Sequence, residues 1–300
     1  MRGIVAAFLL AAVETAGEAT PLADVAGPKD SRRLVWSDDF AGAELDRKKW
    51  GVRHSMNSTD CLYANDERTM RIEDGCLRLE ALPSPDPAKR CLLPRGVSTH
   101  DRMSFKYGYL EMRARVPFRH GAWPSFWMQS VTDGRKASWM SEIDIFEVFS
   151  STNRLSANLH KWFWDGQAKR MEHVMVLGGE GAGVVNRSYV FENTKTLNDE
   201  FHVYGFEWTP KTARFYVDGH CFSCLQIDEA NDYAPWNKAL KGMAGHHDFH
   251  AILLNNEVFT PGHGWMPSGA ELKREDLPIR YEIDWIRLYQ KEGEDFRLMR

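Results

Sequence analysis

Three carboxyl groups lie within six residues of an apolar run in the middle of the chain, at Glu142, Asp144 and Glu147. Side chains alternate across a β-strand, so Glu142 and Asp144 share one face. Glu147 is out of phase by one residue, and on a regular strand it would point into the core, where an unpaired ionised carboxylate is very costly. A β-bulge near Ile145 and Phe146 would return it to the face of Glu142, and bulges are common beside active sites. The pattern predicts a bulged strand with three acids on one face.

Two carboxyl groups on one face of a sheet can hydrolyse a glycosidic bond. One attacks the anomeric carbon, and the other protonates the leaving oxygen and then activates water. Retention of configuration needs the two groups about 5–5.5 Å apart, whereas Cα atoms four strand positions apart lie about 13 Å from each other. The side chains of Glu142 and Glu147 must therefore lean together. Asp144 can hydrogen-bond a neighbouring carboxyl and separate the two pKa values by like-charge coupling. A solvated acidic strand face is the alternative, which the nearby tryptophans disfavour.

Short segments of alternating polar and apolar residues recur along the chain, and turn residues separate them. Asp218-Gly219 lies between two of these segments and is a hairpin signal. No long amphipathic helix alternates with the segments, which favours an antiparallel sheet. We therefore predict an all-β protein, an antiparallel β-sandwich in one domain, with long and functional loops at 165–198 and 228–247. The predicted strands cover 70–82, 107–116, 201–208, 214–217, 221–227, 249–254 and 281–289.

The N-terminal residues have the form of a secretory signal peptide. Arg2 precedes an apolar segment at 4–13 and small residues near 17–19. The apolar segment is too short to span a bilayer. We expect a secreted or periplasmic protein that has no membrane association after signal removal. The predicted organisation is a signal peptide at 1–19, a polar lead at 20–33, a catalytic domain at 34–292 and a C-terminal tail at 293–300.

The net charge and the cysteine residues argue against two further functions, nucleic-acid binding and zinc binding by a CxxC pair. A formal net charge of −4 is not that of a nucleic-acid binder. Five cysteines in an exported chain permit disulfides, and the odd number leaves at least one free thiol. Cys221 and Cys224 have CxxC spacing, but on a strand they face opposite ways. Without a second CxxC pair, this spacing does not predict a zinc site.

The segment 141–147 resembles the bulged form of the E-x-D-x-x-E signature of glycoside hydrolase family 16. Further stretches are similar to this family in the same order along the chain, from about residue 36 to residue 289. They are a strand pair before the catalytic strand, a later hairpin and a closing strand, at 107–113 with 121–128, 201–209 with 215–219, and 281–289.

The resemblance implies a jelly-roll β-sandwich with a concave glycan-binding cleft. It makes Glu142 the nucleophile, Glu147 the acid/base and Asp144 their modulator. It implies a polysaccharide partner, a monomer and no cofactor for catalysis. The substrate-binding candidates are Trp123, Trp139, Trp127, His160 and Trp162, although Trp127 fits a core position equally well. Asp39, Gly75 and Asp284 match the positions that hold a structural calcium ion in many members.

The substrate stays open at this stage. We expect a retaining endo-glycosidase, an O-glycoside hydrolase acting on β-1,3-glucan. The alternatives are an endo-β-galactanase acting on agar-, porphyran-, carrageenan-type or host galactans, and a non-catalytic carbohydrate-binding protein. Retention of both glutamates favours the enzyme.

Segments 157–162 and 253–258 are expected to approach the cleft. Six basic residues before Trp123 could suit a sulfated galactan, but a solvated strand face explains them better; they are Arg95, Arg102, Lys106, Arg113, Arg115 and Arg119.

Overall fold

The computed structural model describes residues 28–53, 60–64, 67–131, 139–150, 153–165, 170–175, 188–191, 198, 200–227, 245–260 and 269–299. At residues 139, 162–165, 170–175, 188, 226 and 245 it describes the backbone alone. The predicted signal peptide and most of the polar lead lie outside the described residues.

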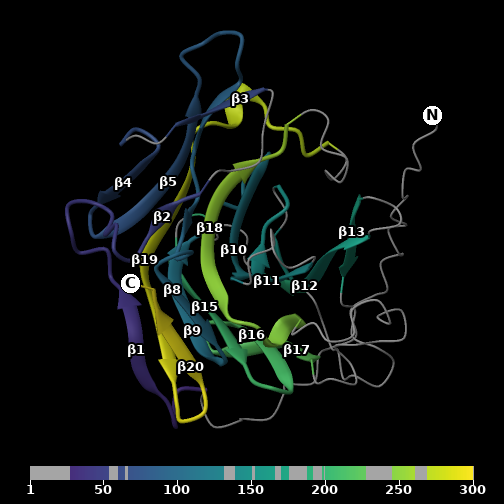
Figure 1. Cartoon of the computed structure of the whole chain (residues 1–300). Helices are drawn as coiled ribbons and strands as arrows, with labels where there is room; N and C mark the ends of the chain where they lie inside the picture. The colour runs from purple at the N-terminus through teal and green to yellow at the C-terminus, as the bar shows by residue number, and fades with distance from the viewer. Residues whose placement is uncertain are drawn as a thin grey trace.

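Two ten-stranded sheets face each other, and we name each after a central strand (Figure 1). The β9 sheet has the order β17 (His220–Gln226), β16 (Thr212–Val217), β15 (His202–Trp208), β9 (Gly108–Arg115), β19 (Ile279–Gln290), β5 (Cys76–Pro83), β6 (Cys91–Pro94) and β3 (Cys61–Ala64). Within it, β1 (Arg33–Asp38) pairs with β19 and β4 (Met70–Glu73) pairs with β5.

The β11 sheet has the order β13 (Arg170–Met175), β12 (Arg154–Asp165), β11 (Trp139–Glu147), β10 (Ala122–Ser130), β18 (His250–Val258), β7 (Val97–Ser98) and β2 (Gly51–Val52). Three further strands join it, namely β14 (Ser188–Val190), β8 (Met103–Lys106) and β20 (Asp295–Leu298). Two short 3-10 helices, η2 (Gly245–His247) and η3 (Arg274–Asp276), connect strands. No helix in the described part of the chain is long and apolar enough to cross a membrane.

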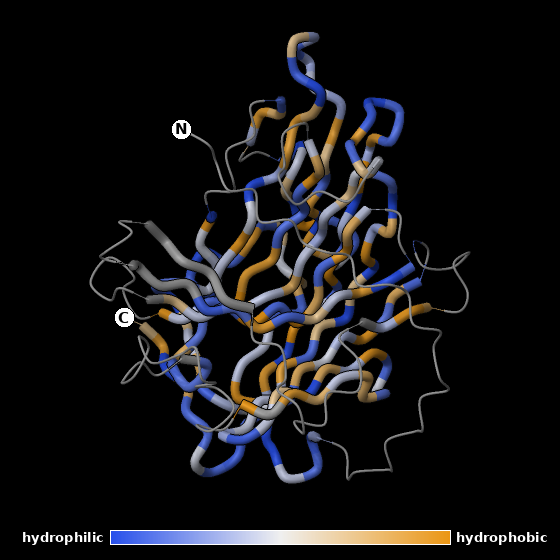
Figure 2. The backbone as a smooth tube through the Cα atoms, turned by 90° about the vertical axis from the view of Figure 1, so that its right-hand side faces the viewer, coloured by the Kyte–Doolittle hydropathy of each residue, from blue (hydrophilic) through white to orange (hydrophobic). Residues whose placement is uncertain are grey.

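The buried apolar side chains of the two sheets form one core cluster. Hydrophobic and hydrophilic residues follow each other along the strands, as the colouring of Figure 2 shows. On β9, Leu110, Met112 and Ala114 are fully buried, while Arg113 and Arg115 occupy the alternate positions. This phase follows from the alternation of side chains along a strand. The predicted antiparallel β-sandwich is confirmed; among the described strands only β3 and β6 pair in parallel. One prediction is wrong: the segment 165–198 contains β13 and β14 and is not a continuous loop.

A disulfide joins Cys61 on β3 to Cys91 on β6, two positions that lie opposite each other in the parallel register. Cys76, Cys221 and Cys224 are free thiols. The expectation of at least one free thiol is therefore confirmed. Cys221 and Cys224 do not pair with each other, as their CxxC spacing within a strand predicts.

Candidate active site

The predicted bulge is present on β11. Towards β12, Asp144 lies opposite Asn158 and Glu147 lies opposite Ser156, so β11 uses one more residue than its neighbour. The register against β10 shifts at the same place. Ile145 and Phe146 are consecutive, yet both are buried, at 2% and 1% exposure. The extra residue thus lets two successive side chains fill the core.

Phe146 reaches the opposite sheet, which fixes the position of the bulge. Its ring centroid lies 4.7 Å from that of Tyr204 on β15 and 6.3 Å from that of Tyr281 on β19. Because Phe146 points into the core, the next residue, Glu147, points to the other side of the sheet. We call this side, which carries Trp123, Trp127, Glu142, Asp144 and Glu147, the outer face of the β11 sheet.

Two neighbouring strands hold the carboxyl group of Glu147. Trp123 on β10 donates a hydrogen bond from Nε1 to Oε1 at 3.0 Å. Asn158 on β12 donates one from Nδ2 to Oε2 at 3.2 Å. The Trp123 ring stacks on Phe259 with a centroid distance of 5.4 Å and an interplanar angle of 7°. Trp123 is therefore fixed on one ring face and orients Glu147; its predicted stacking against a sugar stays a prediction.

His160 lies against the acids. It pairs with Glu142 across the β11–β12 register, and its Nε2 is 2.9 Å from Oδ2 of Asp144. Asp144 and His160 are 3% and 8% exposed. The structure thus places the predicted histidine beside the modulating aspartate, where its charge bears on both acids.

Arg53 and Trp127 form a second unit on the outer face. The Arg53 guanidinium carbon lies 4.3 Å from the Trp127 ring centroid, within the range of a cation–π contact. Trp127 Nε1 donates a hydrogen bond to Asn255 Oδ1 at 3.0 Å. One face of this ring is therefore covered by protein, and Trp127 belongs to the outer face of the sheet, not to the core. The sequence interpretation did not identify Arg53.

A fourth carboxyl group lies on the same face at Glu257 of β18. Tyr63 on β3 donates a hydrogen bond from its hydroxyl to Glu257 Oε2 at 2.9 Å, and Asn255 Nδ2 lies 3.4 Å from Oε1. Glu257 pairs with Trp123 across the β10–β18 register. The expectation that segments 157–162 and 253–258 approach the site is confirmed by Asn158 and Glu257. Tyr63, which follows the disulfide cysteine Cys61 by two residues, was not anticipated.

Burial dominates the electrostatics of the three acids on β11. It raises the pKa of Glu142, of Asp144 and of Glu147, each to about 8. Repulsion from Asp144 raises the pKa of both glutamates further. The charges of His160 and Arg53 lower the pKa of Glu142. The hydrogen bonds from Trp123 and Asn158 lower the pKa of Glu147.

The charge of Arg53 distinguishes the two glutamates. It favours ionisation of Glu142, whereas the hydrogen bonds from Trp123 and Asn158 act on Glu147. Retaining hydrolysis needs Glu142 as a carboxylate and Glu147 as an acid, and Arg53 shifts Glu142 in that direction. These are the two states that a nucleophile and a proton donor need.

Two predicted substrate residues lie where only the backbone is described. Trp139 begins β11 and pairs with Phe163, and Trp162 on β12 pairs with Met140. Their side chains lie outside the described part of the structure, so their contacts with substrate stay predictions.

The residues predicted to hold calcium lie on the β9 sheet and its turns. The Asp284 carboxylate is paired with the Arg113 guanidinium. Asp39 accepts a hydrogen bond from the backbone N–H of Ala41 at 3.4 Å. Gly75 lies in the turn before β5 with φ of +72°. A calcium ion would have to displace Arg113 from Asp284, so these residues as arranged do not fit the ion, and calcium stays a prediction.

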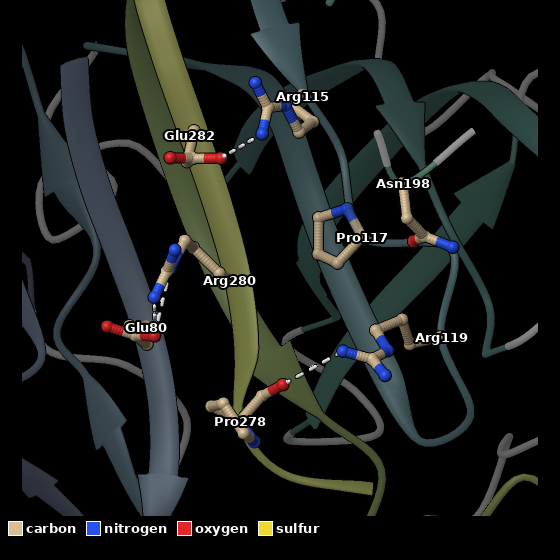
Figure 3. A pocket seen from close by; sticks show the side chains of 8 residues that line it. All are labelled: Glu80, Arg115, Pro117, Arg119, Asn198, Pro278, Arg280 and Glu282. Carbon is tan, nitrogen blue, oxygen red and sulfur yellow. Dashed lines mark hydrogen bonds and ion pairs between the residues drawn. The ribbon is translucent and has the colours of Figure 1, made fainter. Parts of the chain in front are cut away.

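A pocket of about 460 Å³ opens on the β9 sheet, away from the three acids (Figure 3). Arg115 pairs with Glu282 at 3.2 Å and Arg280 pairs with Glu80 at 2.9 Å. Arg119 donates a hydrogen bond to the carbonyl oxygen of Pro278 at 3.4 Å. Arg113 and Arg115 thus lie on the opposite sheet, and Arg119 lies in the segment that follows β9. For these three of the six basic residues, the placement agrees with a solvated strand face and its loops.

A jelly-roll sandwich that presents paired buried carboxyl groups on the outer face of one sheet is the architecture of a glycan-cleaving hydrolase. The family model described as "Beta-porphyranase A-D, GH16 domain" matches residues 34–291. The chain therefore belongs to glycoside hydrolase family 16, a family of O-glycoside hydrolases.

Curated relatives are similar at modest identity. Glucan endo-1,3-beta-glucosidase A1 of Niallia circulans is 25% identical over 284 residues, which cover 86% of this chain and 38% of that protein. Beta-glucanase of Rhodothermus marinus is 29% identical over 270 residues, covering 86% and 85%. Keratan-sulfate endo-1,4-beta-galactosidase of Sphingobacterium multivorum is 24% identical over 264 residues, covering 86% and 55%. The chain thus spans less than two thirds of the length of two of these three relatives.

The fold agrees with a solved structure. The X-ray structure of the laminarinase from Rhodothermus marinus superposes with a TM-score of 0.64 at 22% identity, covering 86% of this chain and 97% of that one. At this level of identity the similarity establishes the jelly-roll fold alone.

Proposed function

We propose that this protein hydrolyses internal bonds of a β-linked polysaccharide by double displacement, with retention at the anomeric carbon. The observation that carries the proposal is the bulge on β11. It brings Glu147 to the face of Glu142 and places its carboxyl group between two hydrogen-bond donors, Trp123 and Asn158.

Each step has a residue in place. Protonated Glu147 gives its proton to the glycosidic oxygen while ionised Glu142 attacks the anomeric carbon, which forms a covalent glycosyl-enzyme. Glu147, now a carboxylate, takes a proton from the water that attacks the same carbon and releases Glu142. Arg53 stabilises the charge on Glu142 before attack, and Asp144 with His160 modulates both glutamates.

The charge on the outer face favours an uncharged sugar beside the cleaved bond. Four carboxyl groups, those of Glu142, Asp144, Glu147 and Glu257, lie there with the cationic Arg53 and with His160. A sulfate or carboxylate on the substrate would be repelled by each of these groups that is ionised, as the proposed nucleophile Glu142 must be. We infer that the first candidate substrate is a neutral β-1,3-glucan. The names of the Niallia circulans and Rhodothermus marinus relatives support a glucan.

A β-galactan is the second candidate. The matching family model carries the name of β-porphyranases, and the Sphingobacterium multivorum relative is named as a β-galactosidase of keratan sulfate. The excess of carboxyl groups leads us to expect cleavage at unsulfated positions of such a polymer.

A panel of polysaccharides tests both candidates. Laminarin, agarose, porphyran and keratan sulfate, the last two with and without desulfation, are incubated with the protein, and reducing ends and product sizes are followed. We expect internal cleavage of laminarin or of an unsulfated galactan, and NMR of the first product should show the β-anomer. A first product in the α-configuration would exclude double displacement. Binding without cleavage of any polymer would favour a carbohydrate-binding protein.

The indole N–H of Trp123 gives a sharper test of the acid/base. Trp123→Phe keeps an aromatic ring but removes the hydrogen bond that lowers the pKa of Glu147. We expect kcat to fall roughly tenfold, the size of a lost bond to a charged group, and the alkaline limb of the pH profile to move to higher pH. Trp50→Phe is the matched control, because Trp50 Nε1 donates to Asp38 Oδ2 at 2.8 Å in the core. It should lower the melting temperature and leave the pH profile unchanged; an unchanged profile in Trp123→Phe would contradict the role of Glu147.

We also propose that the protein works outside the cytoplasm. The Cys61–Cys91 disulfide supports this location, because structural disulfides persist in oxidising compartments.

A further inference from the structure

Three groups on neighbouring strands converge on one point of the outer face. Glu142 and Asp144 on β11 and His160 on β12 each offer one ligand atom, and these atoms all lie within 4.8 Å of one another. Two are carboxylate oxygens and one is an imidazole nitrogen. Imidazole nitrogens and carboxylate oxygens are both zinc ligands in proteins.

One of these ligand groups carries an atom without a hydrogen bond. Oδ2 of Asp144 is fully buried and has no hydrogen-bond partner among the described residues. His160 Nε2 lies 2.9 Å away, but its direction does not satisfy hydrogen-bond geometry. Buried carboxylate oxygens normally accept a hydrogen bond, so an ion at this point would give Oδ2 of Asp144 the partner that the ion pair with His160 does not supply by a hydrogen bond.

We propose that Glu142, Asp144 and His160 bind a zinc ion. Around tetrahedral zinc, oxygen and nitrogen ligands 2.0–2.1 Å from the metal lie about 3.3 Å from each other. The Asp144–His160 separation of 2.9 Å is close to this value, and the widest separation of the three atoms, at most 4.8 Å, needs a contraction of about 1.5 Å. Rotation of the Glu142 side chain can supply it. Three protein ligands leave the fourth position to water.

The imidazole selects the metal. Calcium and magnesium take oxygen ligands and prefer six or more of them, whereas zinc accepts a nitrogen ligand in a four-coordinate site. Arg53 opposes the ion, because its charge acts on Glu142. We therefore expect weaker binding than at a closed structural zinc site, in a range where added zinc regulates the protein and chelators reverse it.

Zinc at this position would occupy the oxygen that attacks the substrate. Inhibition competitive with polysaccharide follows, and this consequence rests on the proposed role of Glu142. The binding itself depends only on the geometry of the three side chains. A binding measurement and an activity measurement therefore separate a failure of the zinc site from a failure of the proposed catalytic role.

Calorimetric titration of the chelator-treated protein with zinc tests the site. We expect one zinc ion per chain, with calcium and magnesium giving no measurable binding, and cobalt giving the visible absorption bands of a four-coordinate site. In His160→Gln the affinity should fall by more than about tenfold, since even loss of a group that supports a ligand costs that much. His120→Gln is the matched control, because His120 pairs with Asp276 at 2.8 Å near η3 and belongs to no such cluster of described residues. This variant should bind zinc as the wild type does.

A second measurement keeps the test valid if a variant is poorly folded. Zinc should raise the melting temperature of the wild-type protein, because a ligand that binds the folded state stabilises it, and this rise should be absent in Asp144→Asn. Unchanged zinc affinity in His160→Gln, or equal losses in His160→Gln and His120→Gln, would overturn the site. Tight binding of zinc without any rise in KM would overturn the inhibitory consequence.

Discussion

Glu142→Ala is expected to lower kcat on polysaccharide by roughly 10⁴-fold or more, the scale seen when a covalent nucleophile is removed. The reason is that the other carboxyl groups described on the outer face are held in place by their own partners. Asp144 is buried at 3% exposure beside His160, Glu147 is held by Trp123 and Asn158, and Glu257 is held by Tyr63 and Asn255. Initial rates of reducing-end release give kcat and KM for the variant and the wild type.

Azide separates the roles of the two glutamates. In Glu142→Ala, azide can enter the space left by the side chain and attack the anomeric carbon directly, so the product should be the α-glycosyl azide. In Glu147→Ala, the glycosyl-enzyme still forms from a substrate with a good leaving group, and azide should release the β-glycosyl azide. The opposite products in the two variants would mean that the roles are exchanged.

An exposed acid provides the control for these substitutions. Glu275 lies in η3 and is exposed. Glu275→Ala should leave kcat, KM and the products unchanged. Wild-type activity in Glu142→Ala would remove the basis of the proposed mechanism.

The sequence is most informative where a local period determines the structure. Because side chains alternate along a strand, Glu147 would face the core if β11 were regular, and this predicts the bulge. The register of β11 against both neighbouring strands confirms the bulge. The same alternation predicts which residues of β9 are buried. Asn158 and Glu257 could be anticipated for the same reason, since each lies in phase with other polar residues on its strand.

Arg53 and Tyr63 could not be found in this way. Arg53 follows β2, a strand of two residues, and Tyr63 lies on β3, a strand of four. Strands this short have no measurable period. Both residues reach the site through pairing with distant segments, because β2 pairs with β7 and β3 pairs with β6. The Cys61–Cys91 disulfide depends on the same parallel register, which explains why cysteine spacing alone leaves the pairing open.

The three buried acids are also expected to make the folded state less stable as the pH rises. A carboxyl group whose pKa is raised from 4.5 in the unfolded chain to about 8 in the folded protein keeps its proton longer when folded. Its stabilising contribution is complete below pH 4.5 and is lost as the pH approaches 8. We therefore expect the melting temperature to fall between pH 5 and pH 8, measured by circular dichroism in buffers of equal ionic strength.

Glu142→Gln should remove part of this pH dependence, because an amide of similar shape cannot ionise. A tenfold change in an ionisation constant corresponds to about 1.4 kcal/mol. If the substitution removes a free-energy cost of that size, the cost of ionising the buried Glu142 carboxyl group, the melting temperature at pH 8 should rise by about 2–4 °C. Activity should be lost in the same variant.

Glu207 provides a control of opposite sign. Burial raises its pKa, but hydrogen bonds from Arg32 and Arg214 outweigh burial and lower it, so Glu207→Gln should be destabilising at pH 8. A melting temperature that rises from pH 5 to pH 8, and that falls in Glu142→Gln at pH 8, would show that the acids are stabilised as carboxylates. In that case Glu147 could not act as the proton donor at neutral pH.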